Sequence, residues 1–144
     1  MSEFETSAFE TSRFETCALA TPEAISETVT DVMAFLQREH VDPRATHHVA
    51  LVIEEMLANL GTHGDCRDTP ARITLRVEPA RITGEIVDRG PAFDPRIAPP
   101  PDLAALPDER KVGGLGLHLV RQLSTLEYSR QGDENHMTFF VVRS

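Results

Sequence analysis

The sequence predicts an α+β fold, a two-layer sandwich in which a mostly antiparallel sheet carries helices on one face. The expected order of elements is a strand, two helices, a hairpin, a proline-rich segment, a short helix and a second hairpin. A doubly wound parallel sheet would need a helix between successive strands. The helical segments are too few and too unevenly placed for that arrangement.

The chain starts with a repeat. Phe-Glu-Thr occurs at residues 4–6, 9–11 and 14–16, a spacing that fits neither a helix face nor a strand face well. We therefore expect a flexible leader over residues 1–12 and a single domain over residues 13–144. The third copy leads into an apolar stretch and could begin an edge strand.

Two helices are predicted next. Thr21, Pro22 and Glu23 supply a hydroxyl cap, a proline at the first helical position and an acid in the first turn, which is typical of a helix start. Residues 42–43 interrupt the periodicity, and a second helix follows over residues 46–62. Its apolar stripe consists of Val49, Val52, Ile53, Met56, Leu57 and Leu60.

Four segments are typical of strands. Residues 72–78 and 82–87 form one predicted hairpin, and residues 125–131 and 136–143 form another across a turn at residues 131–134.

The composition excludes several classes of function. Lys and Arg total 14 and Asp and Glu total 23, so the formal net charge is −9. Nucleic acids and acidic membranes attract basic faces, so direct binding to either is not expected. No apolar run approaches the roughly 18–20 residues of a membrane helix, and the acidic first residues are unlike a secretory signal. We expect a cytoplasmic protein in which Cys17 and Cys66 are free thiols, with one disulfide between them as the alternative.

The second helix carries the first candidate site. Glu55, Asn59 and His63 follow one another at four-residue spacing, which places them together at the edge of the apolar stripe. Polar groups on the inner side of a helix are costly unless they meet partners. The three side chains are therefore either a hydrogen-bonded seam at the helix end or part of a functional site.

Two further motifs follow strands or open helices. Asp88 and Gly90 come directly after a strand, where the acid could accept a hydrogen bond from a ligand amino group and the glycine permits close approach; a plain turn is the alternative. Residues 95–112 hold five prolines without clear periodicity, so they are either disordered or a functional lid. The glycine-rich residues 113–117 then open a helix that continues to about residue 123, where backbone amides could hold an anion. A simple turn is again the alternative.

The order of these motifs resembles that of the histidine-kinase/gyrase-type ATPases. Residues 55–64 resemble the N box of that superfamily, residues 88–95 its G1 box and residues 114–117 its G2 box. The short chain and the Glu-x-x-x-Asn-x-x-x-His pattern are similar to the anti-sigma factor serine/threonine kinases of the RsbW type. The resemblance covers about residues 15–144 and implies a histidine-kinase-like ATPase fold that binds ATP and Mg²⁺.

The resemblance also implies roles for individual residues. Glu55 would be the general base, and Asn59 would ligate Mg²⁺. Asp88 would bind the adenine amino group with Gly90 beside the base, and Thr138 would assist at the adenine end.

The remaining roles concern the phosphates. Lys111, or else Arg110, would neutralise charge on the γ-phosphate. The motif from Gly114 through Leu115 and Gly116 to Leu117 would hold the phosphates through backbone amides. His63 would contribute to the nucleotide site or, equally, serve in packing at the helix end.

The sequence departs from the family pattern at two places. Ala92 stands where relatives often have a second glycine, and Val112 precedes the glycine turn where some have arginine.

The function that the resemblance implies is partner switching. The chain would phosphorylate a serine or threonine of an anti-sigma-antagonist (STAS-type) protein, could bind a sigma factor, and could form a homodimer. The alternative is a nucleotide-responsive anti-sigma or signalling adaptor without effective phosphotransfer. A dimerisation protein with no nucleotide affinity is the third interpretation.

Overall fold

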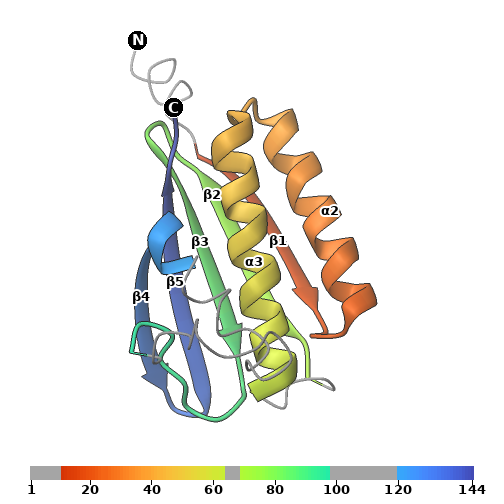
Figure 1. The fold of residues 1–144 in the computed structure, drawn as a ribbon, viewed down its shortest axis with the longest axis vertical. Coiled ribbons are helices and arrows are strands. Elements are labelled where there is room, and N and C mark those ends of the chain that lie inside the picture. The colour runs from red at the N-terminus through yellow and green to blue at the C-terminus, as the bar shows by residue number, and fades with distance from the viewer. Residues whose placement is uncertain (1–10, 64–68, 98–119) are drawn as a thin grey trace, which may run out of the picture.

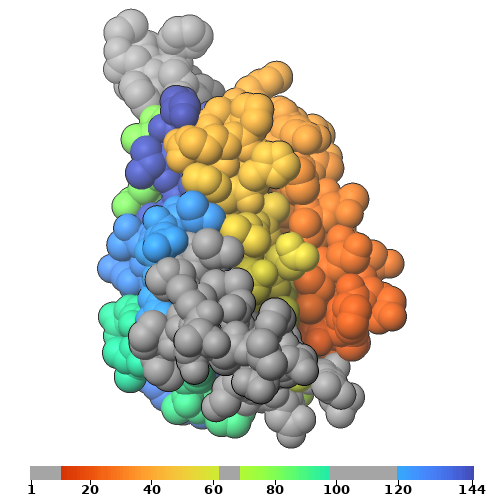
Figure 2. Space-filling view, viewed as in Figure 1, coloured from red at the N-terminus to blue at the C-terminus, as the bar shows by residue number. Residues whose placement is uncertain are grey.

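The structure is a computed structural model that describes residues 11–63, 69–97 and 120–144, and it confirms the predicted two-layer α+β fold (Figure 1). The strands form one sheet in the order β1-β2-β3-β5-β4, and every neighbouring pair is antiparallel. They are β1 (Ser12–Ala18), β2 (Ala71–Val77), β3 (Arg81–Asp88), β4 (Thr125–Gln131) and β5 (Glu134–Val142). Helices α2 (Pro22–Arg38) and α3 (Pro43–His63) lie side by side on one face of the sheet and form a continuous surface (Figures 1 and 2).

Both helices begin with a capping residue followed by proline. Thr21 accepts a hydrogen bond from the backbone N–H of Ala24 at 3.3 Å, as predicted. Asp42 accepts one from the N–H of Ala45 at 3.0 Å, so α3 begins at Pro43 and not near residue 46. Residues 42–43 do not merely interrupt the helical pattern. They start the second helix, because proline needs no hydrogen-bond acceptor at the first helical position.

The strands lie close to their predicted positions. β4 occupies residues 125–131 as expected, while β5 begins at Glu134, two residues before the predicted start. Among the described strands, β1 pairs with β2 alone and is an edge strand, as suggested by the third Phe-Glu-Thr copy, which it contains. In the turn between β4 and β5, Gly132 has a φ of +62°, which glycine adopts without strain.

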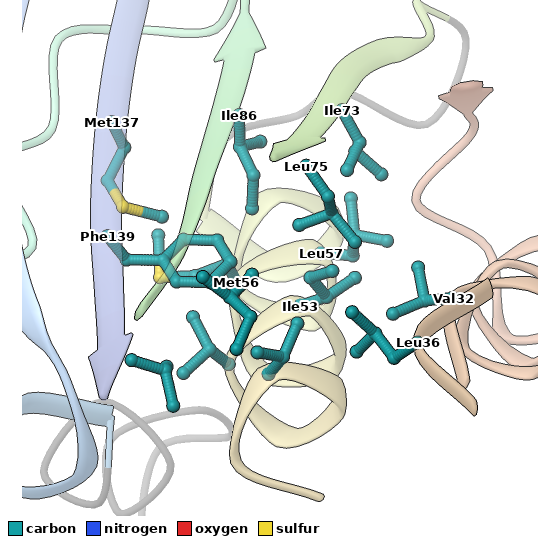
Figure 3. Packing of buried hydrophobic residues seen from close by; sticks show 14 of the residues in the cluster. Val32, Leu36, Ile53, Met56, Leu57, Ile73, Leu75, Ile86, Met137 and Phe139 are labelled. Atoms are coloured by element: carbon teal, nitrogen blue, oxygen red, sulfur yellow. The ribbon is translucent and has the colours of Figure 1, made fainter. Parts of the chain in front are cut away.

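The core lies between the helices and one face of the sheet (Figure 3). All six predicted stripe residues of α3 are buried. Ile53, Met56 and Leu57 of α3 face the strands, and Val32 and Leu36 of α2 close the core on the β1 side (Figure 3). The strands contribute Ile73, Leu75, Ile82, Ile86, Met137, Phe139 and Val141. Within the described residues no helix is both long enough and apolar enough to cross a membrane.

One position in β3 requires glycine for packing. A Cβ atom on Gly84 would lie 2.2 Å from Cζ of Phe139, its partner on β5, and the Phe139 side chain is fully buried. Gly84→Ala should therefore lower the free energy of unfolding by about 1–3 kcal/mol, a typical cost of overpacking. Urea denaturation measures this, with Gly132→Ala as a contrast, because a Cβ there meets nothing within 4 Å and adds only backbone strain. A stability of Gly84→Ala equal to that of wild type would contradict the packing.

Candidate functional site

A pocket lies at the end of the sandwich where α3 and β3 end and β5 begins. These ends of α3, β3 and β5 lie at the bottom of Figure 1. The pocket is walled by α3, by the loop after β3 and by the β4–β5 hairpin. Met56 and Met137 form part of its floor and also belong to the core (Figure 3). The pocket is lined by Met56, Asn59, Leu60, Asp88, Pro91, Phe93, Pro95, Tyr128, Asn135 and Met137.

Asn59 is the polar residue that α3 contributes to this pocket. It lies between Met56 and Leu60 on the inner side of the helix, and only 1% of its surface is exposed. Its Oδ1 atom has no hydrogen-bond partner in the described part of the chain. A buried oxygen without a partner costs about 1–3 kcal/mol, so this atom is suited to a ligand or a cation that would complete its bonding.

Asp88 reaches the same pocket from the end of β3 and is 7% exposed. Its Oδ1 accepts hydrogen bonds from the backbone N–H of Gly90 at 2.8 Å and from Nδ2 of Asn135 at 3.0 Å. A carboxylate can accept about four hydrogen bonds, so this anchoring is compatible with a further donor from a ligand. Gly90 is itself buried beside the carboxylate. The structure therefore brings Asn59 and Asp88 into one pocket, with Gly90 hydrogen-bonded to Asp88.

Asn135 is a site residue that the motifs did not reveal. It opposes Asp88 in the β3–β5 register, and 4% of its surface is exposed. Besides Asp88, its amide group donates to the carbonyl oxygens of Gly90 and Pro91, at 3.3 and 2.9 Å. Its Oδ1 accepts from the hydroxyl of Tyr128 at 2.6 Å.

The loop after β3 is held by the hairpin. Arg130 of β4 donates from Nη1 to the carbonyl of Gly90 at 2.7 Å and to Oδ1 of Asn135 at 3.2 Å. Further along the loop, Asp94 forms an ion pair with Arg96 at 2.8 Å. The hydrogen bond from Arg96 keeps the pKa of the Asp94 carboxyl below its ordinary value. These contacts fix the loop on which Pro91 and Phe93 line the pocket.

Glu55 lies one helical turn before Asn59 and is half-buried, outside the residues that line the pocket. Burial raises the pKa of its carboxyl, and the negative charge of neighbouring Glu54 raises it further. A raised pKa makes the ionised carboxylate a stronger proton acceptor, which suits a general base.

Thr138 is not at the pocket, contrary to the role that the resemblance implied. Side chains alternate between the two faces of a strand, and Thr138 lies between buried Met137 and Phe139 on β5. It therefore faces the side of the sheet away from the helices, with Glu85 and Glu127 as its register partners. The position across from Asp88 belongs to Asn135.

Most of the remaining predicted site residues lie outside the residues that the structure describes. His63 is the last residue of α3, and its side chain lies outside the described part of the structure. The residues predicted at the phosphates, Lys111, Gly114, Leu115, Gly116 and Leu117, lie outside the described residues, as does Cys66. Cys17 is an exposed free thiol on β1.

Comparisons with known proteins agree with this architecture. Serine/threonine-protein kinase BtrW of Bordetella bronchiseptica is 34% identical over 118 residues, which cover 77% of this chain and 83% of BtrW. A structure of the RsbU and RsbW domains of Rv1364c from Mycobacterium tuberculosis matches with a TM-score of 0.65 at 13% identity, covering 92% of this chain and 33% of that one. Histidine kinase AdeS of Acinetobacter baumannii matches with a TM-score of 0.51 at 16% identity, covering 98% of this chain and 72% of AdeS.

The two structural matches show a shared fold, and this chain spans about a third of the mycobacterial one. The histidine kinase-like ATPase domain family matches residues 18–140, which include every strand at least in part and both helices. With the 34% identity to BtrW, this match decides the family. The chain belongs to the histidine kinase-like ATPase domain family.

Proposed function

We propose that this chain is an ATP-binding serine/threonine protein kinase that regulates a sigma factor by phosphorylating an anti-sigma-antagonist protein of the STAS type. The observation that carries the proposal is the pairing of two buried polar side chains in one pocket. Asn59 presents an oxygen without a protein partner, and Asp88 presents an anchored carboxylate. The 34% identical relative is named a serine/threonine-protein kinase, and the match covers 77% of this chain and 83% of BtrW. Both facts support the proposal of protein kinase activity.

The pocket supports recognition of an adenine nucleotide. Asp88 would accept a hydrogen bond from the exocyclic amino group of adenine, while Gly90 permits the base to approach the backbone. Pro91, Phe93 and Met137 supply apolar surface for the ring. The predicted phosphate contacts, Lys111 and the amides of residues 114–116, remain part of this proposal.

Asn59 would hold Mg²⁺ together with the phosphates. Mg²⁺ prefers hard oxygen ligands and commonly takes only one or two from protein, so the buried Oδ1 fits the ion. Among the described residues no cluster of three or more His, Cys, Asp or Glu is placed to hold a metal ion. Mg²⁺ commonly takes its other ligands from substrate phosphates and water, and the nucleotide would supply the phosphates here. Mg²⁺, when bound, neutralises negative charge on the phosphates.

Glu55 would act on the partner's hydroxyl group. As the serine or threonine oxygen forms a bond to the γ-phosphorus, the bond to the oxygen that bridges the β- and γ-phosphates breaks and ADP leaves. The hydroxyl proton passes to the Glu55 carboxylate, which must therefore be ionised beforehand.

Replacing Asn59 tests the pocket. Wild type should bind ATP more tightly with Mg²⁺ than without it, and Asn59→Ala should lose this difference because the variant lacks the oxygen that would face the ion. Isothermal titration of ATP with and without Mg²⁺ measures both. Gln37→Ala, which removes an exposed carboxamide from α2, is the matched control and should behave as wild type. An unchanged magnesium effect in Asn59→Ala would remove this residue from the site.

Transfer itself is tested with γ-labelled ATP and purified proteins of the STAS type. Label on a serine or threonine of the partner would support the proposal. Nucleotide-dependent binding of the partner without labelling would instead favour the adaptor function.

A further inference from the structure

We infer that Asn135 is a positioning residue that keeps Asp88 oriented as a hydrogen-bond acceptor and thereby selects purine nucleotides with an amino group at C6. The inference rests on the proposed binding of an adenine nucleotide. It concerns a residue on β5 that the sequence motifs do not include.

The two ends of the Asn135 side chain face groups of opposite kind. Its Nδ2 faces acceptors only, the Asp88 carboxylate at 3.0 Å and the carbonyls of Gly90 and Pro91. Its Oδ1 faces donors, the Arg130 guanidinium at 3.2 Å, the Tyr128 hydroxyl at 2.6 Å and a longer contact from the backbone N–H of Phe93 at 3.4 Å. An arginine cannot accept and a carboxylate cannot donate, so the amide has one allowed orientation.

This orientation places two donors on one oxygen of Asp88. Asn135 and the N–H of Gly90 both donate to Oδ1, which restrains the orientation of the carboxylate. A carboxylate held in this orientation can accept a hydrogen bond from an amino group at C6 of a purine. It cannot donate one to a carbonyl group at the same position of the ring. The preference for a 6-amino purine is thus set by Asp88 and held by Asn135.

The hairpin and the loop after β3 are coupled through the same residue. Arg130 donates hydrogen bonds to both Gly90 and Asn135, and Asn135 donates to the carbonyls of Gly90 and Pro91. The Asn135 side chain thus connects β3, β4 and the loop after β3. Aspartate at position 135 would have the same size but would set a second carboxylate about 3 Å from that of Asp88. Two ionised carboxylates at that distance repel each other, so sharing one proton between them is favoured when the pH allows it.

Asn135→Asp provides the test because its effect should depend on pH. Within residues 11–63, 69–97 and 120–144, the titratable or charged groups that contact this position are Asp88 from β3 and Tyr128 and Arg130 from β4, while α3 contributes the neutral Asn59 to the same pocket. Arg130 and Tyr128 favour negative charge on the new carboxylate. At pH 8.5 this carboxylate should repel that of Asp88, whereas at pH 5.5 the two groups should share one proton.

The experiment titrates ATP, and purine riboside triphosphate without the 6-amino group, into the proteins at both pH values. Wild type should prefer ATP by about tenfold at both, the scale of one hydrogen bond to a charged group. Asn135→Asp should lose most of this preference at pH 8.5 and regain it at pH 5.5. Gln131→Glu, the same amide-to-acid change at an exposed position of the hairpin, should match wild type.

Three results would overturn the inference. The variant could keep the wild-type preference at both pH values, or it could lose affinity for both nucleotides equally, as a merely structural role requires. If Asn135→Asp does not fold, Tyr128→Phe serves instead, because it removes one hydrogen-bond donor to Oδ1 of Asn135. This variant should reduce the preference for ATP over the purine analogue about two- to fivefold. An unchanged preference would count against the inference. Absence of ATP binding by wild type would instead refute the proposed function beneath it.

Discussion

Replacing Glu55 with glutamine is expected to lower kcat for phosphotransfer by about 10²- to 10⁴-fold, the usual contribution of a general base. Affinity for ATP should stay within about twofold of wild type, because Glu55 lies outside the residues that line the pocket. Label incorporation into the partner gives kcat, and calorimetric titration gives the affinity. A variant that transfers phosphate as fast as wild type would exclude Glu55 as the base.

The pH profile gives an independent measure of the same role. A base acts only when deprotonated, so activity should rise with pH through the pKa of Glu55, which burial and then Glu54 hold above the ordinary value of 4.5. Glu54→Gln removes the neighbouring negative charge and should shift this acidic limb to lower pH without changing the plateau. A limb that does not move in Glu54→Gln would assign it to another group.

The fold could be predicted from the sequence because its elements have strong local signals. The cap and proline at the start of α2 and the stripe from Val49 to Leu60 each determine an element without tertiary information. The start of α3 was predicted too late, because Asp42 and Pro43 are common both in turns and at helix starts. The hydrogen bonds from the N–H of Ala45 to the Asp42 side chain and from the N–H of Thr46 to the Asp42 carbonyl identify a helix start.

The candidate site was predictable where its residues lie on one element and not where it depends on pairing between strands. Asn59 and Asp88 stand in local motifs, but their meeting in one pocket requires the sheet register. Thr138 was misplaced for the same reason. The alternation of Met137, Phe139 and Val141 already puts Thr138 on the opposite face and Asn135 on the inner one, a signal that strand parity alone could have supplied.

Asp88→Asn is expected to weaken ATP binding by about 10- to 100-fold, the range for a lost hydrogen bond to a charged group. The asparagine side chain has one oxygen, and two fixed donors, the N–H of Gly90 and Nδ2 of Asn135, already point at that position. Its amide nitrogen must therefore take the place of the other carboxylate oxygen and would face the adenine amino group, donor against donor. Because both anchoring bonds survive, the loop and the fold should remain intact.

Titration calorimetry with ATP measures this loss, and Asp133→Asn is the matched control, since it makes the same change at an exposed turn position. The preference for ATP over the purine analogue should vanish in Asp88→Asn at every pH, because the variant has no carboxyl group to titrate there. That pattern differs from Asn135→Asp, where the preference should return on acidification. Wild-type affinity in Asp88→Asn would show that the ligand's amino group does not bind at β3, and the nucleotide would have to sit elsewhere in the fold.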